Sequence, residues 1–185
     1  MKEKYKILRN AVTPEVCDLI KNSLNISKDI KYFVTGMPKD NHVVFGDPQC
    51  SNSFAMYGNL TCEALLVSLQ SLVEEVSQKK LIPTYSYSRI YWQGATLEEH
   101  RDGPRCEYSV TLCIENKNDP WAIYMGSEEV LLNAGDLVVY KGMELLHHRN
   151  VLEDDTEVTQ VFLHYVDADN EYAEWALDKR PVLGL

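Results

Sequence analysis

The sequence predicts a mainly β (α+β) domain, in which short antiparallel strands form a sandwich or barrel behind two N-terminal helices. From Tyr85 onward, short runs rich in β-branched and aromatic residues follow one another closely. Turn sequences such as "NAG" and "YKG" separate these runs. Strands this short and this dense are typical of an antiparallel sandwich or barrel. The two longer helical patterns lie before Tyr85.

Two helices and a short strand are predicted before that point. The segment "YKILRNAV" is expected to form the strand. Thr13 and Pro14 then form a good helix start, with a hydroxyl N-cap followed by proline at the first helical position. An apolar stripe follows at helical spacing: Val16, Leu19, Ile20 and Leu24. A second stripe runs from Leu65 to Val76.

The remaining segments are less regular. Residues 32–58 contain glycine, proline and aromatic residues with little periodicity, so we expect a loop with one or two short strands. This stretch is either a functional loop beside the site or a plain cover over the core. We predict that it shapes access of the substrate. The final segment "DADNEYAEWALDKR" is expected to form a short helix.

Length and composition fit one domain. The chain has 185 residues, of which 45% are hydrophobic. We divide it into helical support and cover (1–84), a barrel core (85–166) and a C-terminal tail (167–185). The net charge of −10 argues against nucleic acid as a partner.

The cysteines and the N-terminus predict where the chain resides. Five irregularly spaced cysteines form no CxxC pair, which favours reduced thiols over a disulfide framework or a zinc site. The start "MKEKYKILRN" lacks the apolar core of a signal peptide, and no apolar run approaches ~18 residues. We therefore expect a cytoplasmic protein without a membrane span.

One motif carries chemistry. In "EEHRDGPRCEYSVTLCI" (98–114), His100 and Asp102 are two residues apart and share one face of a strand. A third ligand is available in "GMELLHHRN", at His147 or His148. Two histidines and one carboxylate form the facial triad of non-haem Fe(II) oxygenases, which leaves open positions on the metal. Strand parity leaves the choice of histidine open, because both preceding leucines are apolar.

Around this motif the chain resembles the 2-oxoglutarate- and Fe(II)-dependent dioxygenases of the prolyl-hydroxylase-like group. The segments that carry the resemblance are "YWQGATLEEHRD", "AGDLVVYKGMELLHH" and "QVFLHYVD". The sequence is also similar to small uncharacterised bacterial and phage oxygenases with the patterns HxDRxxCExSxTL and ELxHxRE, and it departs from them at Gly103 and Asn150. Alignment to ELxHxR selects His147 as the third ligand.

The resemblance implies a double-stranded β-helix, which is a jelly-roll or cupin-like barrel, with the helices packed outside. It implies Fe(II) and 2-oxoglutarate as cofactors and O₂ as co-substrate. The implied activity is that of a hydroxylase, an oxidoreductase that converts 2-oxoglutarate to succinate and CO₂ and hydroxylates a small molecule or a peptide side chain. It further implies that Tyr91 lines the co-substrate pocket. Ser109, which matches the pattern, offers a hydroxyl there.

One family feature is missing. No arginine or lysine lies about ten residues after the distal histidine, where most members bind the distal carboxylate of 2-oxoglutarate. We expect Arg149 to take this role, since it shares strand parity with His147 and a guanidinium can bind a carboxylate through two hydrogen bonds. Arg105, Gln160 and His164 are the alternatives.

Two other interpretations stay open at this level. Arg149 could instead be a surface residue paired with one of the acids at 153–155. The missing anchor also leaves room for a cupin-like metal-binding barrel without oxygenase turnover, acting as a binding module.

Overall fold

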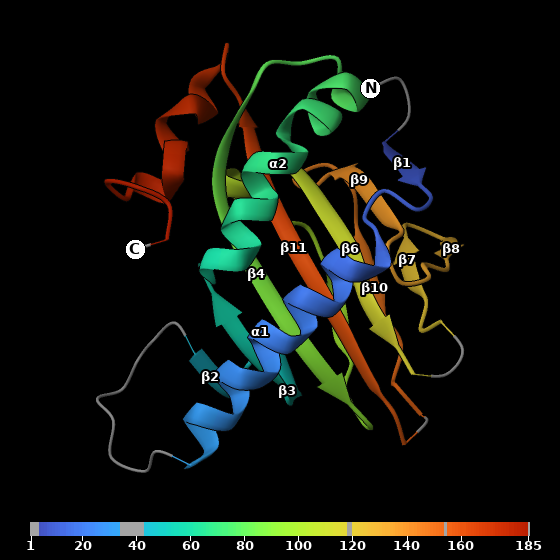
Figure 1. Cartoon of the computed structure of the whole chain (residues 1–185). Helices are drawn as coiled ribbons and strands as arrows, with labels where there is room; N and C mark the ends of the chain where they lie inside the picture. The colour runs from blue at the N-terminus through green and yellow to red at the C-terminus, as the bar shows by residue number, and fades with distance from the viewer. Residues whose placement is uncertain (1–3, 34–42, 118–119, 154, 185) are drawn as a thin grey trace.

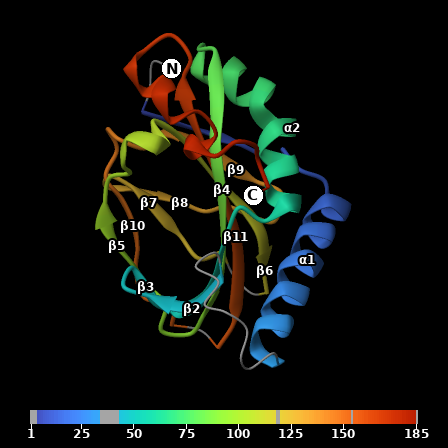
Figure 2. The same ribbon diagram turned by 90° about the vertical axis from the view of Figure 1, so that its left-hand side faces the viewer.

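The computed structural model describes residues 4–33, 43–117, 120–153 and 155–184. Two antiparallel sheets face each other in these residues (Figures 1 and 2). The major sheet has the order β1 (Tyr5–Leu8), β9 (Leu137–Lys141), β6 (Tyr108–Asn116), β11 (Glu157–Asp167), β4 (Leu81–Trp92), β3 (Cys50–Tyr57) and β2 (Val43–Asp47). The minor sheet has the order β5 (Leu97–His100), β10 (His147–Arg149), β7 (Ile123–Met125) and β8 (Glu128–Val130). The predicted jelly-roll architecture is confirmed.

Both predicted N-terminal helices cover the outer face of the major sheet (Figures 1 and 2). Helix α1 (Pro14–Phe33) begins where Thr13 and Pro14 predict, and the Cys17 N–H donates to the Thr13 carbonyl. Helix α2 (Leu60–Ser77) is capped by Asn59, whose side chain accepts from the N–H groups of Thr61 and Cys62. The main core lies between these helices and the sheet, away from the space between the two sheets.

Two local predictions are corrected in detail, and the prediction of short strands in the irregular stretch is confirmed. Strand β1 ends at Leu8 because Asn10 adopts a positive φ of 51°, which turns the chain toward α1. The irregular stretch contributes a hairpin of β2 and β3, while residues 34–42 lie outside the described part of the chain. The C-terminal helix is a 3₁₀ segment (η2, Glu171–Lys179) with left-handed residues at Leu177 and Asp178.

The region predicted as support and cover therefore also builds the sheet. Residues 1–84 supply β1, β2 and β3 to the major sheet in addition to both helices. Strand β4, the first strand of the predicted core, begins at Leu81. Strand β1 pairs with β9, so the start of the described chain is tied to a strand more than a hundred residues later.

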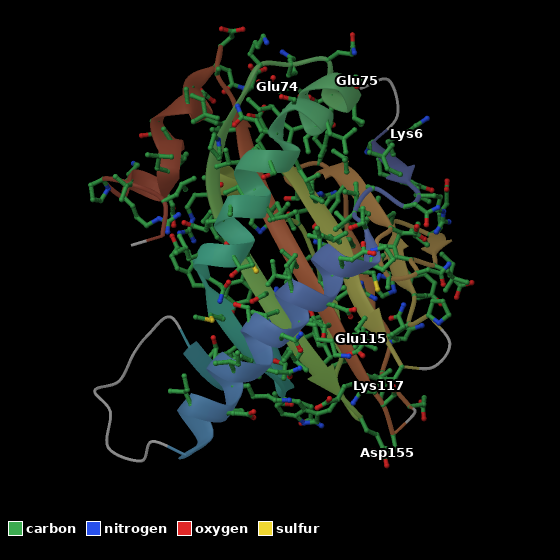
Figure 3. All side chains as sticks on the ribbon, in the orientation of Figure 1. Lys6, Glu74, Glu75, Glu115, Lys117 and Asp155 are labelled. Carbon is green, nitrogen blue, oxygen red and sulfur yellow. The ribbon has the colours of Figure 1, made fainter. Side chains whose placement is uncertain are left out.

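Alternation along β4 positions the site. Tyr85, Tyr87, Arg89 and Tyr91 line a cavity of about 480 Å³ between the two sheets, while Ile90 packs with the helices. Charged side chains lie at the two ends of the molecule, with Glu74 and Glu75 at the end of α2 and Lys117 and Asp155 at the opposite end (Figure 3). Within the described residues, no helix has the length and apolar character needed to cross a membrane.

Candidate metal centre and co-substrate pocket

Strands β5 and β10 of the minor sheet bring three candidate metal-binding side chains together. His147 on β10 lies opposite His100 on β5 in the antiparallel register. The Nε2 atoms of His100 and His147 lie 3.8 Å and 3.6 Å from Asp102 Oδ1. Ligand atoms of all three residues lie within 4.8 Å of one another. Two imidazoles and a carboxylate in this arrangement suit a divalent transition metal such as Fe(II).

Backbone carbonyls orient both imidazoles. His100 Nδ1 is 2.7 Å from the Glu98 carbonyl oxygen, and His147 Nδ1 is 3.1 Å from that of Leu145. Because a carbonyl only accepts, Nδ1 carries the proton on each ring and the lone pair lies on Nε2. Both lone pairs are therefore available at the centre of the cluster. Burial, as the main cause, lowers the pKa of His147 and favours the neutral form that binds a metal.

His148 lies on the other face of β10. Its ring stacks on Tyr124 with centroids 4.8 Å apart, and its Nδ1 is 3.7 Å from a carboxylate oxygen of Glu99. The structure thus places His147, and not His148, beside His100 and Asp102. This is the arrangement that alignment to the oxygenase pattern selects and that strand parity alone leaves open.

Ser109 lies behind the Asp102 carboxylate. Its hydroxyl is fully buried, donates to Asp102 Oδ2 at 2.7 Å, and lies 3.0 Å from His164 Nδ1. Because the Ser109 hydroxyl proton is donated to the Asp102 carboxylate, the Nδ1–H of His164 must donate to the Ser109 oxygen. The structure places the Ser109 hydroxyl against Asp102 and His164, and its contact with the co-substrate stays a prediction. The bond leaves Oδ1 as the carboxylate oxygen that faces the histidines.

His164 lines the cavity, as alternation with Phe162 and Gln160 predicts. Its ring lies 4.5 Å from that of Tyr85. Burial lowers the pKa of His164 to about 4, so the ring is neutral at neutral pH. A neutral imidazole whose Nδ1 proton is already donated leaves His164 ill suited to bind a carboxylate through charge.

Arg149 points into the space between the sheets. Its side chain is 1% exposed, Nη1 donates to the Trp121 carbonyl oxygen at 2.5 Å, and the guanidinium lies 4.8 Å from the Trp121 ring centroid. Nε and Nη2 have no hydrogen-bond partner among the described residues. The surface interpretation is wrong, because the side chain is buried; of the acids proposed as its partners, Asp154 lies outside the described residues.

Two neighbouring polar groups are also unsatisfied. The Tyr91 hydroxyl and the Gln160 Oε1 atom are buried and lack partners within the described chain. Burial raises the pKa of Tyr91 to about 12, although nearby Arg89 and Arg149 act in the opposite direction. Unpaired buried polar atoms are rare because each costs about 1–3 kcal/mol. Tyr91 lines the cavity close to Arg149, whereas Arg149 and Gln160 are not part of the lining, so a polar ligand would approach the guanidinium beside Tyr91.

A second buried arginine was missed from the sequence. Arg89 is 3% exposed and binds Asp47 through both terminal nitrogens, at 3.2 Å and 2.7 Å. It also donates to Gln49 and Ser53. The alternation of "YSYSRIYW" puts Arg89 on the same face as Tyr91, and that signal would have identified it. Because Arg89 already has a carboxylate, Arg149 is the buried guanidinium that still needs one.

Arg105 lies at the edge of the cavity rather than in the Arg149 cluster. Its side chain is 47% exposed, donates to both carboxylate oxygens of Asp178, and lies over the Tyr85 ring. Arg105 is therefore placed to contact a molecule that enters the cavity. It is a poorer candidate than Arg149 for an enclosed carboxylate.

Comparison with known proteins places this fold in one class. No protein-family model and no curated protein sequence matches the chain. Several solved structures do match the chain. HygX from Streptomyces hygroscopicus, with nickel, 2-oxoglutarate and hygromycin B bound, superposes with a TM-score of 0.66 at 10% identity, over 90% of this chain and 84% of that one.

Two further structures agree. A prolyl-4-hydroxylase from Pseudomonas putida has a TM-score of 0.59 at 13% identity, covering 87% of this chain and 92% of its own. The epimerase SnoN, in complex with Fe³⁺, alpha ketoglutarate and nogalamycin RO, has a TM-score of 0.66 at 12% identity. The match covers 99% of this chain and 88% of SnoN. The chain has the fold of the 2-oxoglutarate-dependent oxygenases, as predicted.

Proposed function

We propose that the chain is an Fe(II)- and 2-oxoglutarate-dependent dioxygenase that hydroxylates a small molecule or a peptide side chain. The observation that carries this proposal is the buried Arg149 guanidinium with two unpaired nitrogens, in a barrel that also brings His100, Asp102 and His147 together. The first feature fits an enclosed carboxylate, and the second fits the metal. An oxygenase of this class needs both.

Each group has a definite task in this proposal. The two Nε2 atoms and Asp102 Oδ1 hold Fe(II), which together with 2-oxoglutarate and O₂ supplies the oxidising power for hydroxylation. Arg149 binds the distal carboxylate of 2-oxoglutarate through Nε and Nη2, and the Tyr91 hydroxyl adds a third donor. Leu97, Ile123 and Phe162 line the cavity between these polar ends and keep that region apolar.

Charge explains why a dianion suits this interior. Burial is the main cause that lowers the pKa of Arg149, so its positive charge is costly without a counter-charge. No carboxylate within the described residues pairs with it. A bound 2-oxoglutarate would provide one.

The rival is a metal-binding barrel of cupin type that binds a ligand without turnover. The lack of a basic residue about ten positions after the distal histidine favours it. Turnover without a prime substrate separates the two. The protein is incubated with Fe(II), 2-oxoglutarate and O₂, and succinate is measured against an Asp102→Ala control. Slow succinate formation that the control lacks supports the oxygenase; an iron-loaded protein that forms none supports the rival.

A further inference from the structure

The exposed part of the cavity lining differs in charge from the rest of the molecule. Four of the residues that line the cavity are exposed: Gln49, Arg101, Gly103 and Arg105. We call these four residues the mouth. Apart from Gly103, each mouth residue has a side chain that donates hydrogen bonds. Two of these side chains are cationic and none is acidic. The chain as a whole has 28 acidic and 18 basic residues, so this is a local reversal of charge.

Gln49 presents its amide nitrogen to the metal centre. Its Oε1 accepts a hydrogen bond from Arg89 Nη2 at 2.9 Å, and its Nε2 lies 3.4 Å from His100 Nε2. Because a guanidinium only donates, the oxygen of the amide must face Arg89 and the NH₂ group must face His100. Gln49 therefore offers N–H donors beside the ligand atom of His100.

A single carboxylate fixes the turn that carries Gln49. Asp47 Oδ1 accepts from the backbone N–H groups of Gln49 and Cys50 at 3.0 Å and 2.8 Å. The same carboxylate accepts from Arg89 and from the Tyr87 hydroxyl. These bonds hold the β2–β3 turn over the cavity, so the amide is positioned before any ligand arrives.

The carboxylates near the cavity are already engaged, either by hydrogen-bond donors or at the metal centre. Asp47 is saturated by the donors just described, and Asp102 faces the two histidines and Ser109. Asp178, beside Arg105, accepts from that arginine and from the Tyr57 hydroxyl at 2.6 Å. A positively charged substrate would have to compete with these donors for a counter-charge.

The arginines, in contrast, retain donors. Arg101 donates through Nε to the Glu144 carbonyl oxygen at 3.2 Å, and no carboxylate in the described part of the chain pairs with it. Arg105 uses Nη1 on Asp178. Guanidinium nitrogens of both residues stay available to an incoming acceptor.

We propose that the prime substrate is an anion whose carboxylate or phosphate group is bound by Arg101 and Arg105, while the Gln49 amide donates to an acceptor oxygen next to the carbon that reacts. This inference rests on the proposed function, because it assigns the substrate of the same metal centre. A different use of the mouth would be to draw in 2-oxoglutarate, which is also an anion. The experiment separates these uses.

Binding is measured on protein loaded with Mn(II) and 2-oxoglutarate under anaerobic conditions, by calorimetry. The probes are matched pairs: N-acetyl amino acids with their primary amides, and sugar phosphates with the free sugars. We expect an anionic member to bind and its neutral partner to bind at least about fivefold more weakly. The two arms distinguish a carboxylate from a phosphate as the recognised group.

Variants localise the effect. Arg101→Gln and Arg105→Gln should each weaken binding of that anion about fivefold, which is the scale of an exposed charge pair, and added salt should reduce the difference. Gln49→Ala should weaken it as well. Lys80→Gln, which removes one positive charge beyond α2 where the lysine is 80% exposed at its side chain, should have no effect.

Three results would overturn the inference: tighter binding of neutral or cationic probes, no binding of any anion in the panel, or an equal loss of 2-oxoglutarate affinity in the two arginine variants. Succinate formation without added substrate is measured in parallel. If succinate forms and the anions fail, the substrate class is wrong while the proposed function stands. If no succinate forms, the function itself fails.

Discussion

A guanidinium that is 1% exposed and bonded through one nitrogen is an unstable arrangement unless something else binds it. Arg149 is in that state, and the Tyr91 hydroxyl and the Gln160 Oε1 atom also lack partners in the described chain. Well-packed apolar residues would cost less at the same positions. The arrangement is therefore best explained by a ligand that supplies a carboxylate.

Replacing Arg149 tests this at a single position. Loss of a buried charge-pair partner costs about 3–5 kcal/mol, so Arg149→Ala should weaken 2-oxoglutarate binding on the order of a hundredfold or more. Arg149→Lys should recover only part of this, since an ammonium cannot form two parallel bonds. Calorimetry on Mn(II)-loaded protein measures both, and metal affinity should stay unchanged. Near-normal 2-oxoglutarate affinity in Arg149→Ala would move the anchor to Arg89 or Arg105.

The metal ligands give a second prediction, with a neighbour as its control. His100→Ala, Asp102→Ala and His147→Ala should each lose most Fe(II) or Mn(II) affinity, because two ligands hold a divalent metal poorly. His148→Ala should lose much less, since its ring stacks on Tyr124 on the other face of β10. Anaerobic metal titration measures this. Loss of binding in His148→Ala with retention in His147→Ala would contradict the described register of β10.

Ser109 gives a third prediction, about orientation rather than ligation. Removing its bond to Asp102 Oδ2 frees the carboxylate to rotate, and loss of such outer contacts typically weakens metal binding about 10- to 100-fold. Ser109→Ala should show this in a Mn(II) titration. Ser86→Ala is the matched control, because Ser86 is equally buried but its hydroxyl has no partner in the described chain. Equal metal affinity in both variants would mean that Ser109 only fills space.

At the scale of elements, the turn between β9 and β10 packs against the metal ligands. A Cβ atom added at Gly142 would lie 2.3 Å from the Cys106 carbonyl oxygen and 2.4 Å from Asp102 Oδ2. Glycine is thus required there for space, and not for an unusual φ. The Gly142 carbonyl oxygen also accepts a hydrogen bond from the Asp102 N–H at 3.0 Å. Gly142 therefore contacts both the backbone and the carboxylate of Asp102.

Gly142→Ala should therefore damage stability and metal binding together. Overpacking of a filled site costs about 1–3 kcal/mol, and the shift needed here moves Asp102 itself. Chemical denaturation and Mn(II) titration are the two measurements. Gly103→Ala is the control, because nothing lies within 4 Å of a Cβ atom added there. A Gly142→Ala variant with unchanged metal affinity would show that the turn can move without the ligand.

The elements also show what could be predicted from the sequence. His100 and Asp102 lie on or beside a short strand with a clear flanking pattern, so spacing and alternation were enough to pair them, whereas choosing His147 over His148 required the resemblance to the oxygenase pattern. The contact between Arg89 and Asp47 joins residues 42 positions apart, through a hairpin whose sequence has little periodicity. No local pattern reports that contact, although alternation along β4 shows that Arg89 faces the cavity.

At the scale of the whole molecule, separate layers perform separate tasks. Helices α1 and α2 build the main apolar core on the outer face of the major sheet (Figure 2). The inner face is thereby left free to carry polar side chains such as Tyr87, Arg89 and Tyr91, opposite the minor sheet that carries His100 and His147. Helical and strand patterns predicted these layers, but the pairing of β1 with β9, such as Ile7 with Val138, is a long-range contact that no local pattern shows.

This separation buries polar groups in the barrel, and it makes the metal-free protein sensitive to acid. Burial lowers the pKa of His164 to about 4 and also lowers the pKa of His147, whereas an unfolded histidine titrates near 6.5. Between about pH 6.5 and 4 the unfolded state therefore binds protons that the folded state does not. Stability must fall as pH falls through this window, by up to about 3 kcal/mol for His164 alone.

Urea unfolding of chelator-treated protein at pH 7, 6, 5 and 4 measures this loss. His164→Asn keeps a donor at the position of Nδ1 but cannot take up a proton, so its stability should fall less between pH 6.5 and 4 than that of the parent chain. His148→Asn removes a histidine from the outer face and should retain the parent's acid sensitivity. If His164→Asn and the parent lose stability in parallel over this range, His164 is not the source of the acid sensitivity, and the loss must come from other groups, such as His147.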